Sequence, residues 1–151
     1  MDYLPITLRI NHARILIVGG GRVATHKATI LHRFTDRARV VAPLISDALK
    51  ALPFEWEERS FQEHDLDDVD LLFVCTGDHD LNAAIREEAR RRHILTSVCD
   101  DPPLCDFISP AIAEYDNLTI AVGSDARDVK RSIRVRDRIR KLVADGVLDI
   151  G

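Results

Sequence analysis

Two groups of residues in this sequence have the types and spacing to take part in chemistry, and the first is a glycine cluster. Gly19, Gly20 and Gly21 precede Ala24 in the form G-x-G-x-x-A. In this form Gly19 makes a tight turn, Gly21 lets the backbone approach a pyrophosphate, and Ala24 lets a helix pack closely on its strand. The pattern favours a dinucleotide site, with phosphates held by free N–H groups at a helix N-terminus. A tight turn that binds nothing is the competing interpretation.

The second group is a pair of carboxylates, Asp100 and Asp101, followed by Pro102 and Pro103. A carboxylate beside a dry cleft and a second carboxylate has a raised pKa, which suits a general base. Aspartates also shape the turns that precede prolines. The residues alone leave both interpretations open.

The histidines and cysteines indicate no metal site. The six histidines are scattered, and the spacing of His26 and His32 does not place two ligands at i and i+4 on one helix face. Cys99 and Cys105 lack a second pair that would complete a site. Three cysteines are an odd, sparse set, so we expect buried free thiols and no bound metal.

The hydrophobic pattern predicts the scaffold that must position these residues. An apolar strand at 15–18 leads into the glycines, and a helix follows over about 22–34. Strand and helix patterns alternate up to residue 99, which indicates a parallel sheet with helical crossovers. The other strands are expected at 38–42, 54–59, 71–75 and 94–99, and the other helices at 45–52 and 80–92. The expected fold is therefore α/β, a Rossmann-like parallel sheet with helices on both faces.

In such a sheet, ligands lie beyond the carboxyl ends of the strands. Four segments should reach that edge, at 19–23, 42–44, 76–80 and 100–106. Two details of the scaffold also follow from the pattern. Strand 54–59 should have one wet face at a sheet edge, and helix 80–92 should turn four apolar side chains inward, those of Leu81, Ala84, Ile85 and Ala89.

The pattern changes after residue 106, so we divide the chain into domains at 1–106 and 107–151. Strands expected at 107–112 and 118–122, joined by a turn, indicate a small antiparallel addition. A helix over 128–144 follows and carries a run of basic residues, Lys130, Arg131, Arg134, Arg136, Arg138, Arg140 and Lys141. Such a run is usually a solvated face, but its guanidinium groups also suit a polyanionic substrate.

Composition excludes several classes of protein. The 151 residues are 46% hydrophobic and 30% charged, a balance typical of a soluble globular chain. The formal net charge of −4 argues against a nucleic-acid partner. We find no apolar run near the roughly 20 residues that span a bilayer and no signal peptide at the start. A cytoplasmic protein with no membrane partner is expected.

Taken together, these motifs resemble the NAD-dependent precorrin-2 dehydrogenases, which form the N-terminal module of siroheme synthases. The resemblance extends from Tyr3 to about Val122 and rests on LPI, ILIVGGGRVATHKA, VVAP, TGDHDLN and DDPPLCDFISPA followed by LTIAV. It implies NAD⁺-dependent oxidation of precorrin-2 to sirohydrochlorin, with Fe²⁺ or Co²⁺ insertion in some members. It also implies a Rossmann domain, a dimerisation segment and a small helical domain, assembled as a homodimer. The α+β extension at 107–151 would then be the dimerisation segment.

The resemblance also assigns roles to individual residues. Gly19, Gly21, Arg22 and Val23 should contact NAD at the glycine turn. Pro43 and Leu44 should do so at the end of the second strand, and Thr76 and Asp78 should line the cofactor edge. Asp100 matches the catalytic aspartate of the family. Because Ala42 and Pro43 end the second strand with no basic residue beside them, a 2′-phosphate would lack a partner, which favours NAD over NADP.

Three features depart from the family pattern. Ser97 stands where many members carry Asn. The S-x-G-G-x-S-P stretch appears at 123–129 without its glycine pair and proline, and the chain stops at Gly151 before most of the helical domain. These departures motivate an alternative hypothesis, a nucleotide-binding or regulatory subunit that keeps NAD but does not catalyse oxidation.

Overall fold

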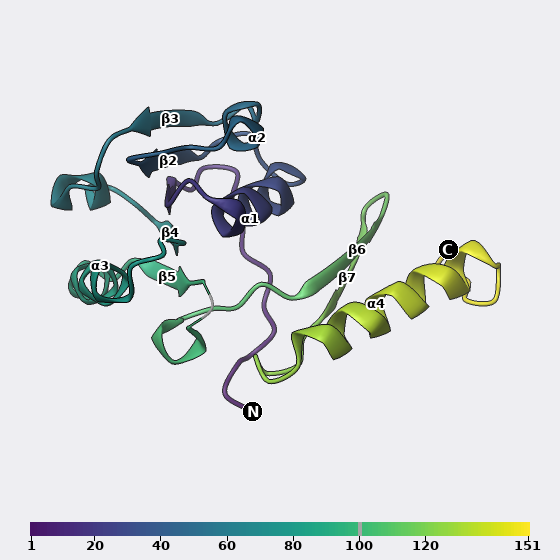
Figure 1. The fold of residues 1–151 in the computed structure, drawn as a ribbon. Helices are drawn as coiled ribbons and strands as arrows, with labels where there is room; N and C mark the ends of the chain where they lie inside the picture. The colour runs from purple at the N-terminus through teal and green to yellow at the C-terminus, as the bar shows by residue number, and fades with distance from the viewer. Residues whose placement is uncertain (100) are drawn as a thin grey trace. The chain divides into compact units, whose positions relative to one another are not determined.

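The computed structural model describes residues 1–99 and 101–151. It divides into two compact units, one of residues 7–107 and one of residues 1–6 with 108–151 (Figure 1). Each unit is described by itself. The predicted catalytic residue, Asp100, lies outside the described residues.

The larger unit is a five-stranded, fully parallel sheet, as the sequence predicts. Its strands are β1 (Ile15–Val18), β2 (Arg39–Ala42), β3 (Glu55–Glu58), β4 (Leu71–Val74) and β5 (Leu95–Val98). Their order, β3-β2-β1-β4-β5, is that of a doubly wound nucleotide-binding sheet. The intervening helices are α1 (Arg22–His32), α2 (Asp47–Lys50), the 3₁₀ turn η1 (Glu63–Leu66), α3 (His79–Arg91) and the 3₁₀ turn η2 (Pro102–Leu104).

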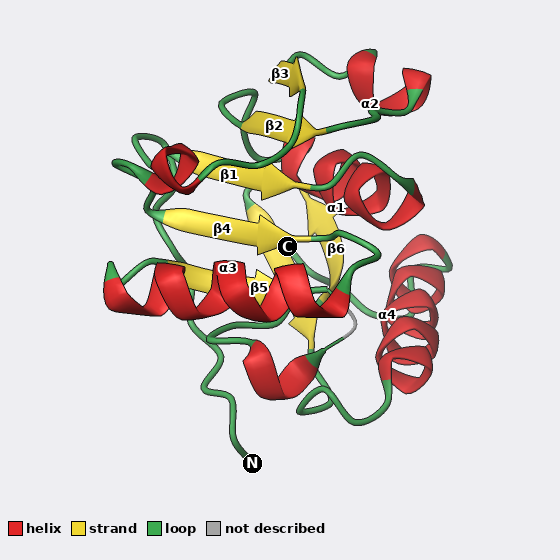
Figure 2. Ribbon diagram, turned by 60° about the vertical axis from the view of Figure 1, so that its left-hand side comes forward, coloured by secondary structure: helices red, strands yellow, loops and turns green. Residues whose placement is uncertain are grey.

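Helices cover both faces of this sheet, which confirms the expected layers. Alternate residues of β1 pack in opposite directions, Ile15 and Ile17 into a core with α1 and α2, and Leu16 and Val18 into a core with α3 and η1. Figure 2 shows α3 across one face and α1 on the other. Burial on both faces explains why β1 and β4 read as unbroken apolar runs.

Two local expectations are wrong in part. β3 lies at the edge of the sheet as expected, but all four of its side chains are exposed, because the apolar residue that enters the core is Phe54, just before the strand. On α3, Ile85 and Ala89 are buried as expected, but Leu81 and Ala84 are exposed. The buried stripe begins instead at Asn82, whose polar side chain hid it from a hydrophobic pattern.

The smaller unit is a hairpin with one long helix. Strands β6 (Ala111–Tyr115) and β7 (Leu118–Val122) pair antiparallel, and α4 (Val129–Ala144) packs on both. Strand β6 begins four residues later than predicted. It starts just after Pro110, which has no N–H to donate to the hydrogen bonds between the strands. Residues 1–6 belong here because the carboxylate of Asp125 accepts hydrogen bonds from the backbone N–H groups of Asp2 and Tyr3, at 2.8 and 3.2 Å. No helix in the described part of the chain is long and apolar enough to span a membrane.

Candidate functional site

The glycine turn lies at the carboxyl end of β1, and its first residue has to be glycine. Gly19 has φ +128°, a conformation that side chains rarely allow. A Cβ there would overlap the carbonyl oxygen of Cys75 and lie 2.7 Å from its carbonyl carbon. The Gly19 N–H donates to the carbonyl of Val41 at 3.0 Å. The turn is therefore fixed between the ends of β2 and β4.

Gly20 is also required, although the pattern G-x-G-x-x-A leaves this position free. A Cβ on Gly20 would overlap the carbonyl oxygen of Leu44 and lie 2.8 Å from Cα of Ile45. The N–H of Ser46 donates to the carbonyl of Gly20 at 2.9 Å. The segment after β2, which holds the predicted residues Pro43 and Leu44, thus lies directly against the glycine turn.

Gly21 differs from its two neighbours because it faces open space. A Cβ there would meet no atom within 4 Å. Gly21 is the N-cap of α1 and provides no side-chain cap, and the first turn of α1 contains no acidic residue. The other α-helices begin at side chains that accept from the backbone, namely Ser46, Asp78 and Asp128. The N-terminus of α1, at Arg22 and Val23, therefore has the free N–H groups and dipole that bind an anion.

Two hydroxyl groups join α1 to the segment after β2. Thr25 Oγ1 donates to the carbonyl of Gly21 at 2.9 Å and lies 2.8 Å from Ser46 Oγ. The same segment is held on its outer side by Glu58, which accepts from the Ile45 N–H at 3.1 Å and from Lys50 Nζ at 2.8 Å. These bonds, that from Lys50 above all, lower the pKa of Glu58. Leu44 itself is 78% exposed.

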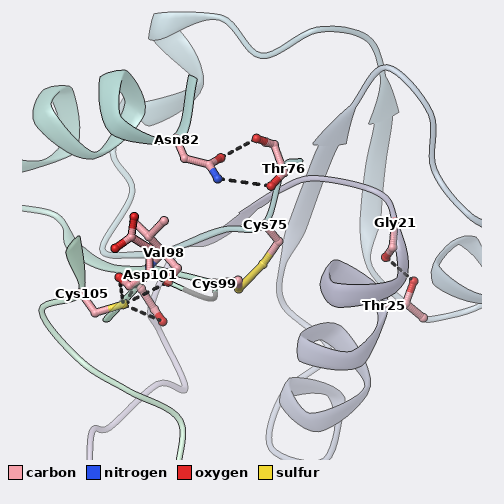
Figure 3. Close-up of a disulfide and its surroundings, with 10 residues drawn as sticks. Gly21, Thr25, Cys75, Thr76, Asn82, Val98, Cys99, Asp101 and Cys105 are labelled. Atoms are coloured by element: carbon pink, nitrogen blue, oxygen red, sulfur yellow. Dashed lines mark hydrogen bonds between the residues drawn. A yellow bond between two sulfur atoms is a disulfide. The ribbon is translucent and has the colours of Figure 1, made fainter. Parts of the chain in front are cut away.

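The loop after β4 carries the predicted residues Thr76 and Asp78. Thr76 Oγ1 donates to Oδ1 of Asn82, and Nδ2 of Asn82 donates to the carbonyl of Thr76 at 3.2 Å (Figure 3). The carboxylate of Asp78 accepts from the N–H groups of Asp80 and Leu81, both at 3.0 Å, and so caps α3. Sequence reasoning missed Asn82, which the motif TGDHDLN contains but which a search for catalytic residue types passes over.

The expectation of free thiols is wrong for two of the three cysteines. Cys75 and Cys99 form a disulfide, with Cα atoms 5.1 Å apart (Figure 3). They follow directly on Val74 and Val98, which are paired in the register of β4 and β5. Parallel strands bring their ends together whatever the distance along the chain, and for that reason the sequence spacing gave no signal. Cys105 remains a free thiol, and its Sγ lies 3.1 Å from the carbonyl oxygen of Val98.

The acidic segment after β5 is described from Asp101 onward. Asp101 precedes η2, and its carbonyl accepts from the N–H of Leu104 at 3.0 Å, while its carboxylate makes no capping bond to that turn. Pro102 occupies the first position of η2, where a missing N–H costs nothing.

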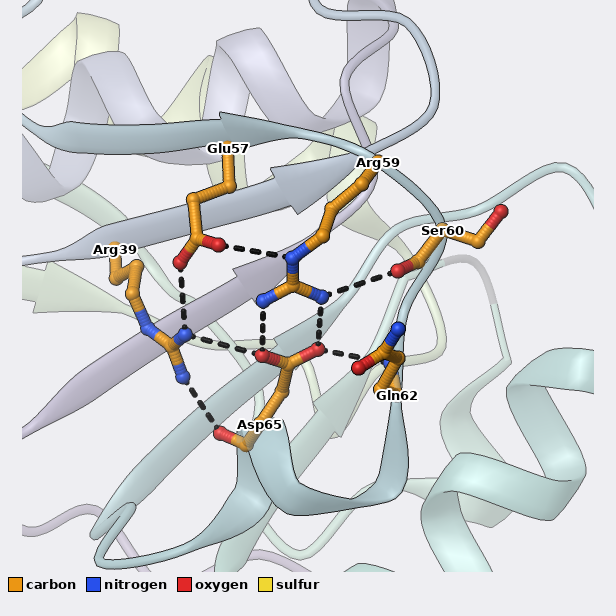
Figure 4. Close-up of polar contacts among 6 residues, drawn as sticks. All are labelled: Arg39, Glu57, Arg59, Ser60, Gln62 and Asp65. Carbon is orange, nitrogen blue, oxygen red and sulfur yellow. Dashed lines mark hydrogen bonds and ion pairs between the residues drawn. The ribbon is translucent and has the colours of Figure 1, made fainter.

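A second polar cluster, centred on Asp65, has a structural role. The Asp65 side chain is fully buried and accepts from Arg59 Nη1 and Nη2, at 2.8 and 2.6 Å, and from Arg39 Nη1 at 3.0 Å (Figure 4). Arg59 above all lowers the pKa of Asp65 to about 2. The cluster ties β2 to η1.

Charged side chains at the amino ends of the strands form ion pairs with one another. At the amino ends of the strands, a groove lined by Arg14, Asp70 and Arg92 contains ion pairs from Arg14 to Asp70 and from Arg92 to Asp67. Within residues 1–99 and 101–151, no three His, Cys, Asp or Glu side chains are arranged to hold a metal ion. The glycine turn with its flanking loops is therefore the candidate functional site.

The chain is similar in sequence to several known proteins. A family model described as putative NAD(P)-binding matches residues 6–111. Siroheme synthase 1 of Yersinia enterocolitica is 35% identical over 154 aligned residues, which cover 99% of this chain and 33% of that protein. Siroheme synthase of Pseudomonas fluorescens is 39% identical over 142 residues, covering 90% of this chain and 31% of the relative. The chain thus spans about a third of the length of these curated relatives.

A solved structure shares the fold. SirC, a precorrin-2 dehydrogenase, matches with a TM-score of 0.76 at 19% identity, over 92% of this chain and 70% of that one. The predicted relationship and the predicted class of cofactor, a nicotinamide dinucleotide, are confirmed by these matches. Because the family model covers well over half of its residues, this chain belongs to the NAD(P)-binding family and has siroheme synthases among its relatives.

Proposed function

We propose that this chain oxidises precorrin-2 to sirohydrochlorin with NAD⁺. One structural observation carries the proposal. Gly19 and Gly20 are packed so tightly that a Cβ would overlap backbone atoms, while Gly21 and the uncapped start of α1 face open space. This is the arrangement that a pyrophosphate requires. The names of the relatives, siroheme synthase and precorrin-2 dehydrogenase, supply the reaction.

The residues present fit a dinucleotide at this edge. We assign the pyrophosphate to Gly19, Gly21 and the N–H groups of Arg22 and Val23. The backbone of Pro43 and Leu44 would face the adenosine ribose, and Thr76 and Asp78 would border the nicotinamide half. Since the end of β2 offers no basic side chain for a 2′-phosphate, we assign NAD rather than NADP.

The oxidation transfers a hydride and releases a proton. NAD⁺, when bound, accepts the hydride. We assign the proton to the carboxylate of Asp100, which directly follows Cys99 in the sequence and is the residue that matches the family's catalytic aspartate. The disulfide between Cys75 and Cys99 ties the residue before Asp100 to the residue before Thr76.

We further propose a homodimer and a cytoplasmic location. The smaller unit supports the dimer, since α4 keeps apolar side chains exposed among its basic residues, including Val129, Ile133 and Val135. Exposed apolar groups on one helix are typical of a surface that a partner covers. The location rests on the proposed reaction, which uses NAD⁺.

The test is turnover. Purified protein is given precorrin-2 and NAD⁺ while NADH absorbance is recorded, and we expect NADH and sirohydrochlorin to form together. Asp100→Ala should abolish turnover and leave the affinity for NAD⁺ within about twofold, because Asp100 is assigned to proton transfer alone. Asp101→Ala is the matched control and should retain turnover, because its carboxylate does not cap η2. Wild-type protein that is stabilised by NAD⁺ but forms no NADH would favour the non-catalytic, regulatory alternative.

A further inference from the structure

We propose that Asn82 and Arg86, one turn apart on α3, are positioning residues for the two loops that border the candidate site. Asn82 holds the cofactor loop, defined as 76–78. Arg86 holds the acidic segment, defined as 101–106. The roles given to these loops rest on the proposed function, whereas the contacts that hold them do not.

Asn82 is buried against the cofactor loop. Only 4% of its surface is exposed. Its amide accepts from Thr76 Oγ1 and donates to the Thr76 carbonyl, so both functional atoms of the amide serve one residue of the loop. Thr76 Oγ1 also lies 3.1 Å from the carbonyl oxygen of Asp78 and accepts from the Asp78 N–H at 3.2 Å. Removing the amide would leave polar groups of the loop without their buried partners.

Arg86 reaches the acidic segment from the next turn of the helix. Its Nε donates to the carbonyl of Leu104 at 2.8 Å, and its Nη2 donates to Oδ1 of Asp106 at 2.6 Å. The other carboxylate oxygen of Asp106 accepts from the Thr96 N–H at 3.0 Å, and the Asp106 N–H donates to the Thr96 carbonyl at 2.8 Å. The segment is thus fixed at both β5 and α3.

The position of the Arg86 guanidinium has a cost in free energy. Its side chain is 15% exposed, and its Nη1 is buried with no hydrogen-bond partner among the described residues. A donor buried in this way costs about 1–3 kcal/mol. A lysine would avoid the unpaired nitrogen but could not bond Leu104 and Asp106 as a fork. The arrangement is therefore one that fixes the segment rather than one that only neutralises a charge.

The helix that carries both residues is itself anchored. Ile85 and Ala89 are buried in the core against β1 and β4, which sets the height and rotation of α3. Asn82 and Arg86, four residues apart, project from the same side of the helix. Since a displacement of about 1 Å in a reacting group can cost about 100-fold in rate, a rigid helix that fixes both loops matters to the reaction.

The two residues should have separable kinetic effects. Asn82→Ala should raise the KM for NAD⁺ about tenfold and change kcat less than threefold, because the cofactor loop binds NAD. Arg86→Met should lower kcat about tenfold and change the KM for NAD⁺ less than threefold, because the acidic segment follows the proposed base. Arg86→Lys should recover part of kcat. The matched control is Arg90→Met, one turn further along α3, whose side chain pairs with Glu87 and which should change neither constant.

Amide hydrogen exchange tests the same inference without turnover. Arg86→Met should accelerate exchange in 101–106 and leave 76–82 near the wild-type rate, and Asn82→Ala should do the reverse. Parallel changes of kcat and KM in both variants, or faster exchange throughout the larger unit, would overturn the inference in favour of general destabilisation. A wild-type protein that fails to oxidise precorrin-2 refutes the proposed function alone. The positioning roles are then decided by exchange and by NAD⁺ affinity.

Discussion

Neighbouring glycines of the turn should respond in opposite ways to the addition of one methyl group. In Gly20→Ala the new Cβ would overlap the Leu44 carbonyl oxygen and lie 2.8 Å from Ile45 Cα. Both are backbone atoms that cannot rotate away, so overpacking should cost about 1–3 kcal/mol. The segment after β2 would have to move, which weakens the bond from the Ser46 N–H to the Gly20 carbonyl by about 1 kcal/mol more. We expect a loss of about 2–4 kcal/mol in the free energy of unfolding.

Gly21→Ala should leave stability nearly unchanged. Its backbone, at φ −87° and ψ −164°, is open to alanine, and a Cβ meets no atom within 4 Å. The loss of a glycine N-cap and the lower entropy of the unfolded chain act in opposite directions, and each is about 1 kcal/mol or less. The methyl group would instead occupy the space assigned to the pyrophosphate. Hydrogen bonds to charged groups contribute about 1.5–3 kcal/mol, so losing one weakens NAD⁺ binding about tenfold or more.

Thermal melting without cofactor and calorimetric titration with NAD⁺ measure the two effects separately. At about 2–4 °C per kcal/mol for a chain of this size, Gly20→Ala should lower the Tm by roughly 4–16 °C. Gly21→Ala should melt within a few degrees of the wild type and bind NAD⁺ at least tenfold more weakly. A Gly20→Ala protein with the wild-type Tm would refute the packing argument. A Gly21→Ala protein with the wild-type Kd would refute the placement of the dinucleotide.

The other stability predictions concern Asp65 and Ala126. The pKa of Asp65 falls from 3.8 in the unfolded chain to about 2 in the folded protein. The ionised carboxylate therefore stabilises the folded protein by about 2–3 kcal/mol above about pH 4. This contribution is lost as the pH falls towards 2. Asp65→Asn leaves Arg59 without its buried partner and should lower the free energy of unfolding by about 3–5 kcal/mol at pH 7. In urea unfolding, the variant's free energy of unfolding should depend less on pH between pH 4 and 2 than that of the wild type. Ala126→Gly should raise the free energy of unfolding by about 1 kcal/mol, because Ala126 has φ +59°; a destabilised variant would contradict this.

The sequence predicted those parts of the fold that depend on local pattern. The apolar run at 15–18 and the glycines after it specify β1 and the turn, since a strand buried on both faces needs unbroken apolar residues and a sharp turn needs Gly19. The pattern also predicted an anion site at the N-terminus of α1, and the structure there has no side-chain cap and no acidic residue in the first turn. The pattern did not predict that Gly20 must be glycine, because the backbone that would overlap its Cβ belongs to Leu44, 24 positions away.

The features that sequence reasoning missed depend on register and on partners distant in the chain. Cys75 and Cys99 meet only because β4 and β5 pair side by side. Asn82 can be buried because its side-chain amide forms hydrogen bonds with Thr76. A hydrophobicity scale counts asparagine as polar and therefore predicts that it is exposed. Asp65 is buried for the same reason, with two arginines as its partners. A polar residue can enter the core when its partners are supplied in three dimensions, and one sequence does not show them.

The altered stretch at 123–129 bears on whether the chain is an enzyme or a regulatory subunit. The two glycines of the pattern it resembles correspond to Asp125 and Ala126, which have φ values of +56° and +59°. The loop therefore keeps the left-handed backbone that glycine favours, although each non-glycine residue there costs about 1–2 kcal/mol. Asp128 still caps α4 by accepting from the Arg131 N–H at 2.8 Å, as a serine at that position would. The departure from the pattern therefore lies in the side chains of this loop, while its backbone keeps the left-handed conformations that glycine favours.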